Sequence, residues 1–106
     1  MISNKILGLL GLSARARKIA FGADSVEEQI KKRKIYLAII AEDSSKRTKE
    51  KFEKLCETYN IPIIIKGNIE ELSKAIGKNN KAIIGIEDIN IAKGIIKIND
   101  GGEVIG

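Results

Sequence analysis

The stretch Tyr36-Leu37-Ala38-Ile39-Ile40-Ala41 (YLAIIA) is an uninterrupted apolar run about as long as one β-strand. A strand that is apolar at consecutive positions has no face suited to water, so both of its faces must be covered. Such strands occur mainly in sheets that carry helices on both sides. The run therefore predicts an α/β fold.

Helix and strand signals alternate on either side of this run. Further strands are predicted at 18–21, 63–65 and 82–86. The helices between them are preceded by side chains that cap helix starts: Ser3, Ser44 or Ser45, Asn68 (with Glu71 three residues later) and Asp88. The resulting order α-β-α-β-α-β-α-β-α predicts a three-layer α/β/α sandwich with a four-stranded, mainly parallel (mixed) sheet. Residues 1–106 are expected to form a single domain.

Composition excludes several classes of protein. Hydrophobic residues make up 43% and charged residues 31% of the chain, which favours a globular protein over a disordered one. No apolar run approaches the roughly 20 residues that cross a bilayer. Cys56 is the only cysteine and histidine is absent, which excludes an intrachain disulfide and histidine general-base catalysis and argues against a zinc site. A cytoplasmic protein without metal or cofactor is expected.

Positive charge is concentrated in the first third of the chain. Residues 1–34 hold eight lysines and arginines against three acidic residues, whereas residues 35–106 hold eleven of each. A localised basic surface favours a polyanionic partner such as nucleic acid. The alternative is an ordinary solvated basic face.

The stretch Phe21-Gly22-Ala23-Asp24-Ser25-Val26-Glu27-Glu28 predicts a helix start between the basic segments 15–18 and 31–34. Exposed amides at such a start can bind phosphate. Alternatively, Asp24 with Glu27, or Ser25 with Glu28, forms a capping box that uses those amides internally. The local sequence leaves both alternatives open.

Signals for catalysis are weak. The pairs Glu42-Asp43 and Glu87-Asp88 each follow a predicted strand, but the chain has no histidine, and no second acidic cluster of evident geometry accompanies Glu42-Asp43. Asp43 is expected to organise its turn and Asp88 to cap a helix. Cys56 lies on the inner stripe of a predicted helix and is expected to be a small core residue. The chain is therefore not expected to be an enzyme.

Five segments together resemble the L7Ae kink-turn-binding ribosomal protein family, and within it the small bacterial members encoded near translation factors. They are FGADSVEEQIKK (21–32), YLAIIAEDSS (36–45), LCETYNIPIII (55–65), GNIEELSKAIGK (67–78) and AIIGIED (82–88). The resemblance implies the same α/β/α sandwich and binding of the kink-turn, a sharply bent RNA element. The binding surface it implies consists of the helix start at 22–28 and the loop after the last long strand.

The family signature at that helix start is glycine, any residue, asparagine, glutamate, two residues, lysine. The matching positions here are Gly22, Ala23, Asp24, Ser25 and Glu28, so only the glycine is kept. An ionised aspartate accepts hydrogen bonds but cannot donate them as asparagine does. Glu28 places an anion where the family has a cation. The scaffold of an RNA site is therefore expected with altered contact residues.

The function expected from these observations is non-enzymatic recognition of structured, kink-turn-like RNA by a monomeric, ribosomal or ribosome-associated protein. The expected RNA-binding residues are Lys18, Gly22, Ala23, Asp24, Ser25, Glu28, Ile86, Glu87 and Asp88. Charge alone adds peripheral phosphate contacts at Arg15, Arg17, Lys31, Lys32 and Arg33. The alternative is a protein–protein interaction module that kept the fold and lost the RNA site.

Overall fold

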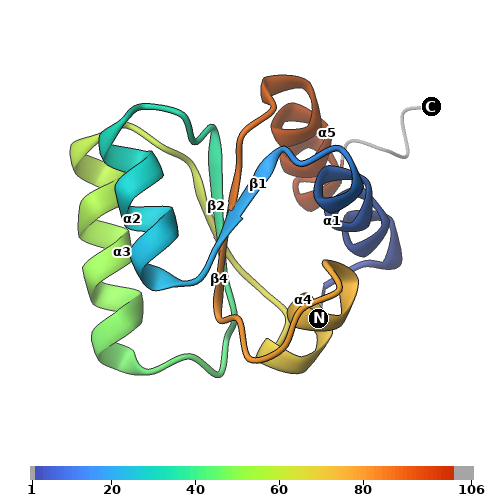
Figure 1. Cartoon of the computed structure of the whole chain (residues 1–106), viewed down its shortest axis with the longest axis horizontal. Helices are drawn as coiled ribbons and strands as arrows, with labels where there is room; N and C mark the ends of the chain where they lie inside the picture. The colour runs from blue at the N-terminus through green and yellow to red at the C-terminus, as the bar shows by residue number, and fades with distance from the viewer. Residues whose placement is uncertain (1, 102–106) are drawn as a thin grey trace.

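The computed structural model describes residues 2–101. Within them a four-stranded sheet lies between two layers of helices, with α2 and α3 on one face and α1, α4 and α5 on the other (Figure 1). The elements are α1 (Asn4–Arg15), β1 (Ile19–Phe21), α2 (Ala23–Lys31), β2 (Leu37–Ile40), α3 (Lys46–Thr58), β3 (Ile63–Ile65), α4 (Ile69–Ala75), β4 (Ile83–Ile86) and α5 (Ile89–Asn99). The predicted α/β/α sandwich and its order of elements are confirmed.

The directions of the strands differ in part from the prediction. The strand order is β1-β4-β2-β3; β2 and β3 are parallel, whereas β4 is antiparallel to both of its neighbours, β1 and β2. The sheet is mixed, as predicted, but the prediction that it is mainly parallel is wrong. Both β2 and β4 are buried along their whole length because they are central strands with helices on both faces. Their continuous apolar runs therefore report burial and not direction.

The antiparallel course of β4 follows from the place where the chain re-enters the sheet. Ile40, the last residue of β2, pairs with Ile65 at the end of β3 and with Ile83 at the start of β4. The connection through α4 thus begins β4 at the same end of the sheet at which β3 finished. A strand parallel to β2 would have to start at the opposite end of the sheet, which requires a crossover connection.

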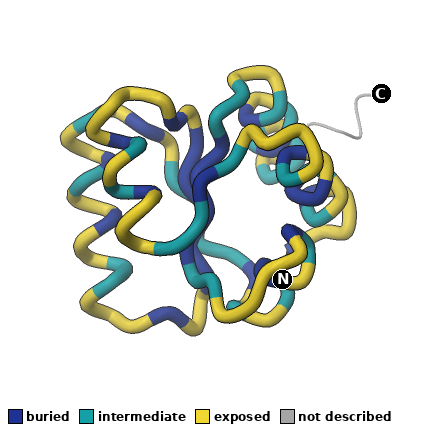
Figure 2. Tube along the Cα trace, viewed as in Figure 1, coloured by how far each residue is buried: buried dark blue, intermediate teal, exposed yellow. Residues whose placement is uncertain are grey.

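Two hydrophobic clusters fill the space on either side of the sheet. One lies under α1, α4 and α5 and includes Ile6, Leu10 and Ile95, all at most 2% exposed. The other lies under α2 and α3 and contains Phe52 and Cys56, each 1% exposed. Figure 2 shows the same division, with buried strands at the centre and exposed residues on the outer sides of the helices. The predicted core position of Cys56 is confirmed.

Side-chain caps begin four of the five helices in residues 2–101. The capping residues are Ser3 for α1, Ser45 for α3, Asn68 for α4 and Asp88 for α5. Asn68 Oδ1 accepts from the Glu71 amide at 2.7 Å, and Glu71 Oε1 accepts from the Asn68 amide at 3.1 Å, which completes the predicted capping box. Of the two candidates before α3, Ser45 is the cap and Ser44 is buried.

We expect Cys56 to react with iodoacetamide only when the protein unfolds. Burial disfavours the charged thiolate and raises the pKa of the Cys56 thiol to about 11, and the thiolate is the reactive form. At about pH 8, alkylation of the folded protein should be at least about a hundredfold slower than in denaturing urea. Mass spectrometry of timed samples measures both rates. Rapid labelling of the folded protein would contradict the core assignment.

Candidate functional site

Helix α2 begins without a side-chain cap. Its N-cap is Gly22, whose φ of 88° lies in the left-handed region that favours glycine, and no side chain hydrogen bonds to this helix start. Both capping-box predictions are wrong, because Asp24 and Ser25 already lie inside the first helical turn. Residues 23–25 are exposed. The amides and the positive dipole end of α2 are therefore open to an anion.

Two lysines from a distant segment lie beside this helix start. Lys78 Nζ is 5.0 Å and Lys81 Nζ 5.6 Å from the centroid of the Phe21 ring. They are brought there because β4 pairs with β1, and the Gly22 amide donates to the carbonyl of Ile83 at 2.9 Å. We call this set the Gly22 surface: Phe21, Gly22, residues 23–25, Lys78 and Lys81. Figure 1 shows the loop between α4 and β4 at the same end of the sheet as the start of α2.

Sequence reasoning missed Lys78 and Lys81. The signal was the segment Lys78-Asn79-Asn80-Lys81, a polar loop between Gly77 and the last strand. Nothing in that loop indicates a neighbour in the first third of the chain.

The other predicted half of the site lies at the opposite end of β1. Ile19 at the start of β1 pairs with Ile86, and the Glu87 amide donates to the carbonyl of Lys18 at 2.8 Å. Three strand residues, about 10 Å, separate this end from Gly22. The structure therefore does not bring Lys18, Glu87 and Asp88 together with the start of α2. The predicted contact by Ile86 is wrong, since its side chain is fully buried.

Three of the four side chains in the acidic pairs have structural partners. Glu87 Oε2 accepts from Gln29 Nε2 at 2.7 Å, and Asp88 Oδ1 accepts from the amides of Asn90 and Ile91 at 2.8 and 3.0 Å. Asp43 Oδ1 accepts from the Ile69 amide at 2.8 Å, so it joins its turn to the start of α4. Within residues 2–101, no three histidine, cysteine or acidic side chains are grouped closely enough to hold a metal. No helix in that range is both long and apolar enough to span a membrane.

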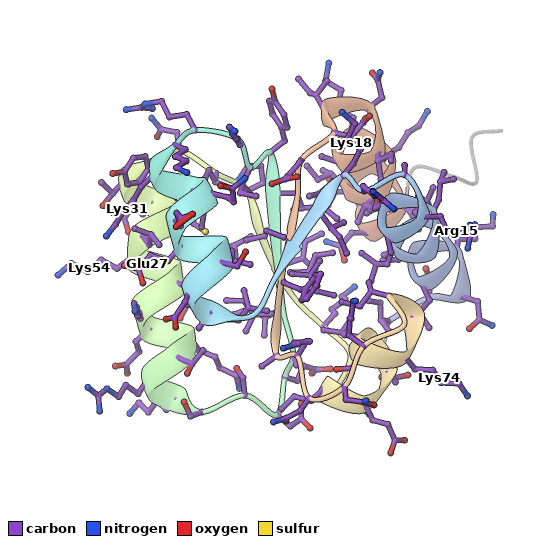
Figure 3. All side chains as sticks on the ribbon, in the orientation of Figure 1. Arg15, Lys18, Glu27, Lys31, Lys54 and Lys74 are labelled. Carbon is purple, nitrogen blue, oxygen red and sulfur yellow. The ribbon has the colours of Figure 1, made fainter. Side chains whose placement is uncertain are left out.

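Two of the predicted phosphate contacts are neutralised by their own helix. Lys31 pairs with Glu27 at 3.0 Å and Lys32 with Glu28 at 3.5 Å. Lys51 of α3 also reaches Glu27, at 2.8 Å. Hydrogen bonds from Lys51 and Lys31 hold the pKa of the Glu27 carboxyl below its usual value. Figure 3 shows Glu27 and Lys31 on α2, beside α3. This side of α2 is close to neutral.

The arginines occupy different surroundings. Arg15 and Arg17 line a hollow of about 400 Å³ along β1, together with Phe21 and Lys78. Arg33 lies at the other end, its guanidinium 5.2 Å from the centroid of the Tyr59 ring. Arg15 and Arg17 thus line the hollow that reaches the Gly22 surface, whereas Arg33 is remote from it.

Residues 4–93 match the profile of the ribosomal protein L7Ae/L30e/S12e/Gadd45 family. The chain belongs to this family. Two similar family proteins carry the name RNA-binding protein YlxQ. The one from Bacillus subtilis (strain 168) is 32% identical over 87% of this chain and 92% of its own length. The one from Enterococcus faecium is 30% identical over 92% of this chain and 93% of its own length. The resemblance inferred from the sequence is confirmed.

Solved structures agree with the L7Ae-type fold. A Bacillus halodurans protein described as having unknown function matches with a TM-score of 0.89 and 34% identity, covering 92% of this chain and 99% of that one. A protein described as the Giardia lamblia 15.5kD RNA binding protein matches with a TM-score of 0.80 and 21% identity, covering 94% of this chain and 92% of that one. The second match concerns the fold alone.

Proposed function

We propose that this protein is a non-enzymatic, cytoplasmic RNA-binding protein, ribosomal or ribosome-associated, that recognises kink-turn-like RNA through the Gly22 surface. It would act as a monomer and as one RNA-binding domain. Family membership supports this proposal, as does the name RNA-binding protein given to the relatives from Bacillus subtilis and Enterococcus faecium. The observation that carries it is the uncapped start of α2 beside Lys78 and Lys81.

The chemistry of this surface suits a phosphate backbone that bends sharply. The amides of the first turn of α2 can donate to phosphate oxygens, and the helix dipole adds a favourable potential. Lys78 and Lys81 can contact a neighbouring phosphate from the other side. A side chain built at Gly22 would meet no atom within 4 Å, so the glycine leaves open space in front of the helix.

The proposed site also contains features that weaken it. Asp24 lies in the first turn of α2, and Glu28 lies one turn further on; both are exposed. Anions at these positions repel phosphate unless they accept hydrogen bonds from bases.

We expect the double variant Lys78→Gln, Lys81→Gln to bind a kink-turn RNA more weakly and with less dependence on salt. Each lost phosphate contact should lower the slope of log affinity against log salt by about one, so the double variant should lose about two. Fluorescence anisotropy with one labelled kink-turn RNA, titrated at several salt concentrations, measures the slope. The matched control is Lys54→Gln with Lys97→Gln, two exposed lysines on α3 and α5.

The result separates this function from its rival. An unchanged slope in the double variant would place the RNA elsewhere on the protein. If the native protein binds neither the kink-turn nor any structured RNA captured from a lysate at near-physiological salt, the protein-interaction module becomes the better account of the fold.

A further inference from the structure

A second basic surface lies at the end of the sheet opposite Gly22. Tyr36 immediately precedes β2, and its side chain is 42% exposed. It lines a hollow of about 320 Å³ with Arg17, Lys18, Arg33 and Lys34. We call these five residues the Tyr36 surface. Figure 3 places Lys18 at this end, where β1 begins and α5 starts.

The charge of this hollow is strongly positive. Its four cations come from two separate segments, one after α1 and one after α2. The carboxylate among its lining residues is Glu87, which already accepts a hydrogen bond from Gln29. Lys31 and Lys32, by contrast, are paired with glutamates on α2. The surface therefore offers an anion several cations at once.

Both arginines of the Tyr36 surface occupy backbone positions that favour glycine. Arg17 and Arg33 have φ of 58° and 59° and follow the C-caps of α1 and α2. At the same position α3, α4 and α5 have Asn60, Gly77 and Gly101, the residue types that usually end helices. A cation near a helix C-terminus is favourable, but Arg15 and Lys31 in the last turns already supply one. The left-handed φ is unfavourable for arginine at both positions, which supports a role for the two arginine side chains outside the helix ends.

Space for an aromatic ligand adjoins the cations. A largely apolar hollow of about 450 Å³ shares Arg33 and Tyr36 with the basic one and is lined further by Tyr59 and Ile89. That volume is within the range of small-molecule sites. An exposed tyrosine flanked by arginines is the combination on which unpaired bases stack, whatever their sequence.

We propose that the Tyr36 surface binds a single-stranded segment of RNA. An unpaired base stacks on Tyr36, and the flanking phosphates contact Arg17, Lys18, Arg33 and Lys34. The choice of RNA as partner rests on the proposed function, but the site is distinct from the Gly22 surface. Arg17 also lines the hollow along β1, which joins the two surfaces. A strand leaving the bent RNA would follow this edge of the sheet.

Tyrosine fluorescence gives a direct test. The chain has two tyrosines and no tryptophan, so Tyr59→Phe leaves Tyr36 as the only tyrosine. The probe is an oligouridylate of about eight nucleotides. We expect it to quench Tyr36 emission in this variant. Made in the native sequence, Tyr36→Ala should lower the affinity for oligouridylate at least about tenfold. Tyr36→Phe keeps an aromatic ring and should lose little of this affinity.

Arg17→Gly tests the strained arginine. It should weaken oligouridylate binding without lowering the melting temperature, because glycine suits that backbone conformation. Lys54→Gln, which removes one positive charge from α3, is the control and should change neither quantity by much. A fall in melting temperature with unchanged binding would assign Arg17 a structural role and contradict the proposal.

The two proposed sites can be tested independently. A kink-turn RNA without single-stranded ends should bind native protein and Tyr36→Ala alike, so loss of oligouridylate binding alone tests the Tyr36 surface. Binding of oligouridylate without binding of the kink-turn would overturn the proposed function and leave this inference standing. The inference would be overturned if Tyr36→Ala did not change the affinity for oligouridylate. It would also be overturned if the native protein bound oligoglutamate of the same charge as tightly as oligouridylate.

Discussion

Phe52→Ala is expected to lower the free energy of unfolding by about 3–5 kcal/mol, a large share of the 5–15 kcal/mol typical of a domain. Phe52 is 1% exposed and lies in the aliphatic cluster under α2 and α3. Truncating it removes the buried ring and leaves a cavity that the surrounding helices and strands can close only in part. Urea denaturation followed by circular dichroism measures the change.

Two variants calibrate this result. Phe52→Leu keeps most of the apolar volume and should cost clearly less. Leu12→Ala removes a side chain that is 44% exposed and should change stability by no more than about 0.5 kcal/mol. A loss below about 1.5 kcal/mol for Phe52→Ala would show that the cluster collapses around the missing ring.

The triple variant Asp24→Asn, Ser25→Glu, Glu28→Lys is expected to bind a standard kink-turn at least about tenfold more tightly than the native protein. The change restores the family signature beside Gly22. Asparagine regains a donor, and lysine replaces an anion that repels phosphate. Each restored polar contact contributes roughly 1–3 kcal/mol by analogy with base readout, and 1.4 kcal/mol is one decade of affinity. Titration with the kink-turn and with an unbent duplex measures affinity and selectivity.

The fold should tolerate these substitutions. All three residues are exposed, and none caps α2. Glu28→Lys replaces the ion pair with Lys32, now at 3.5 Å, by two like charges one turn apart. Such a pair costs only about 0.2–0.5 kcal/mol.

A matched control separates the effect of the restored family signature from the effect of the added positive charge. The triple variant raises the net charge by two, and Glu57→Lys on the exposed side of α3 does the same. Glu57→Lys should leave kink-turn selectivity unchanged. If the native protein already binds the kink-turn tightly and selectively, then Asp24, Ser25 and Glu28 do not weaken kink-turn binding, and the prediction is wrong. If neither protein binds it, the defect lies in the segment Lys78–Lys81, which supplies the other side of the Gly22 surface.

The elements of the fold were predictable because their signals are local. Apolar periodicity located the helices and strands, and Ser3, Asn68 and Asp88 marked helix starts through side chains that reach only two or three residues along the chain. The start of α2 was the exception. Asp24 and Ser25 are good capping residues, but Gly22 begins the helix earlier, so a local signal was present without its usual role.

The candidate site was only half predictable. Gly22 and the first turn of α2 belong to one continuous segment, and the family resemblance identified them. Lys78 and Lys81 were missed, and residues 86–88, which the prediction grouped with Gly22, lie at the other end of β1. Both differences have one cause: β4 runs antiparallel to β1, which places the start of β4, and not its end, beside Gly22.

The sequence by itself determined the α/β class, the order of elements, most helix caps, the core position of Cys56 and the family, because these depend on contacts within a segment or on pattern along the chain. Only the tertiary structure decided the direction of β4, and with it which loops share an end of the sheet. It also divided the basic first third between a neutralised side of α2, the hollow along β1 and the Tyr36 surface. Strand direction depends on backbone hydrogen bonding between distant residues such as Ile19 and Ile86. A buried apolar strand has the same apolar pattern whether it runs parallel or antiparallel to its neighbour, so the pattern along the chain does not reveal the direction.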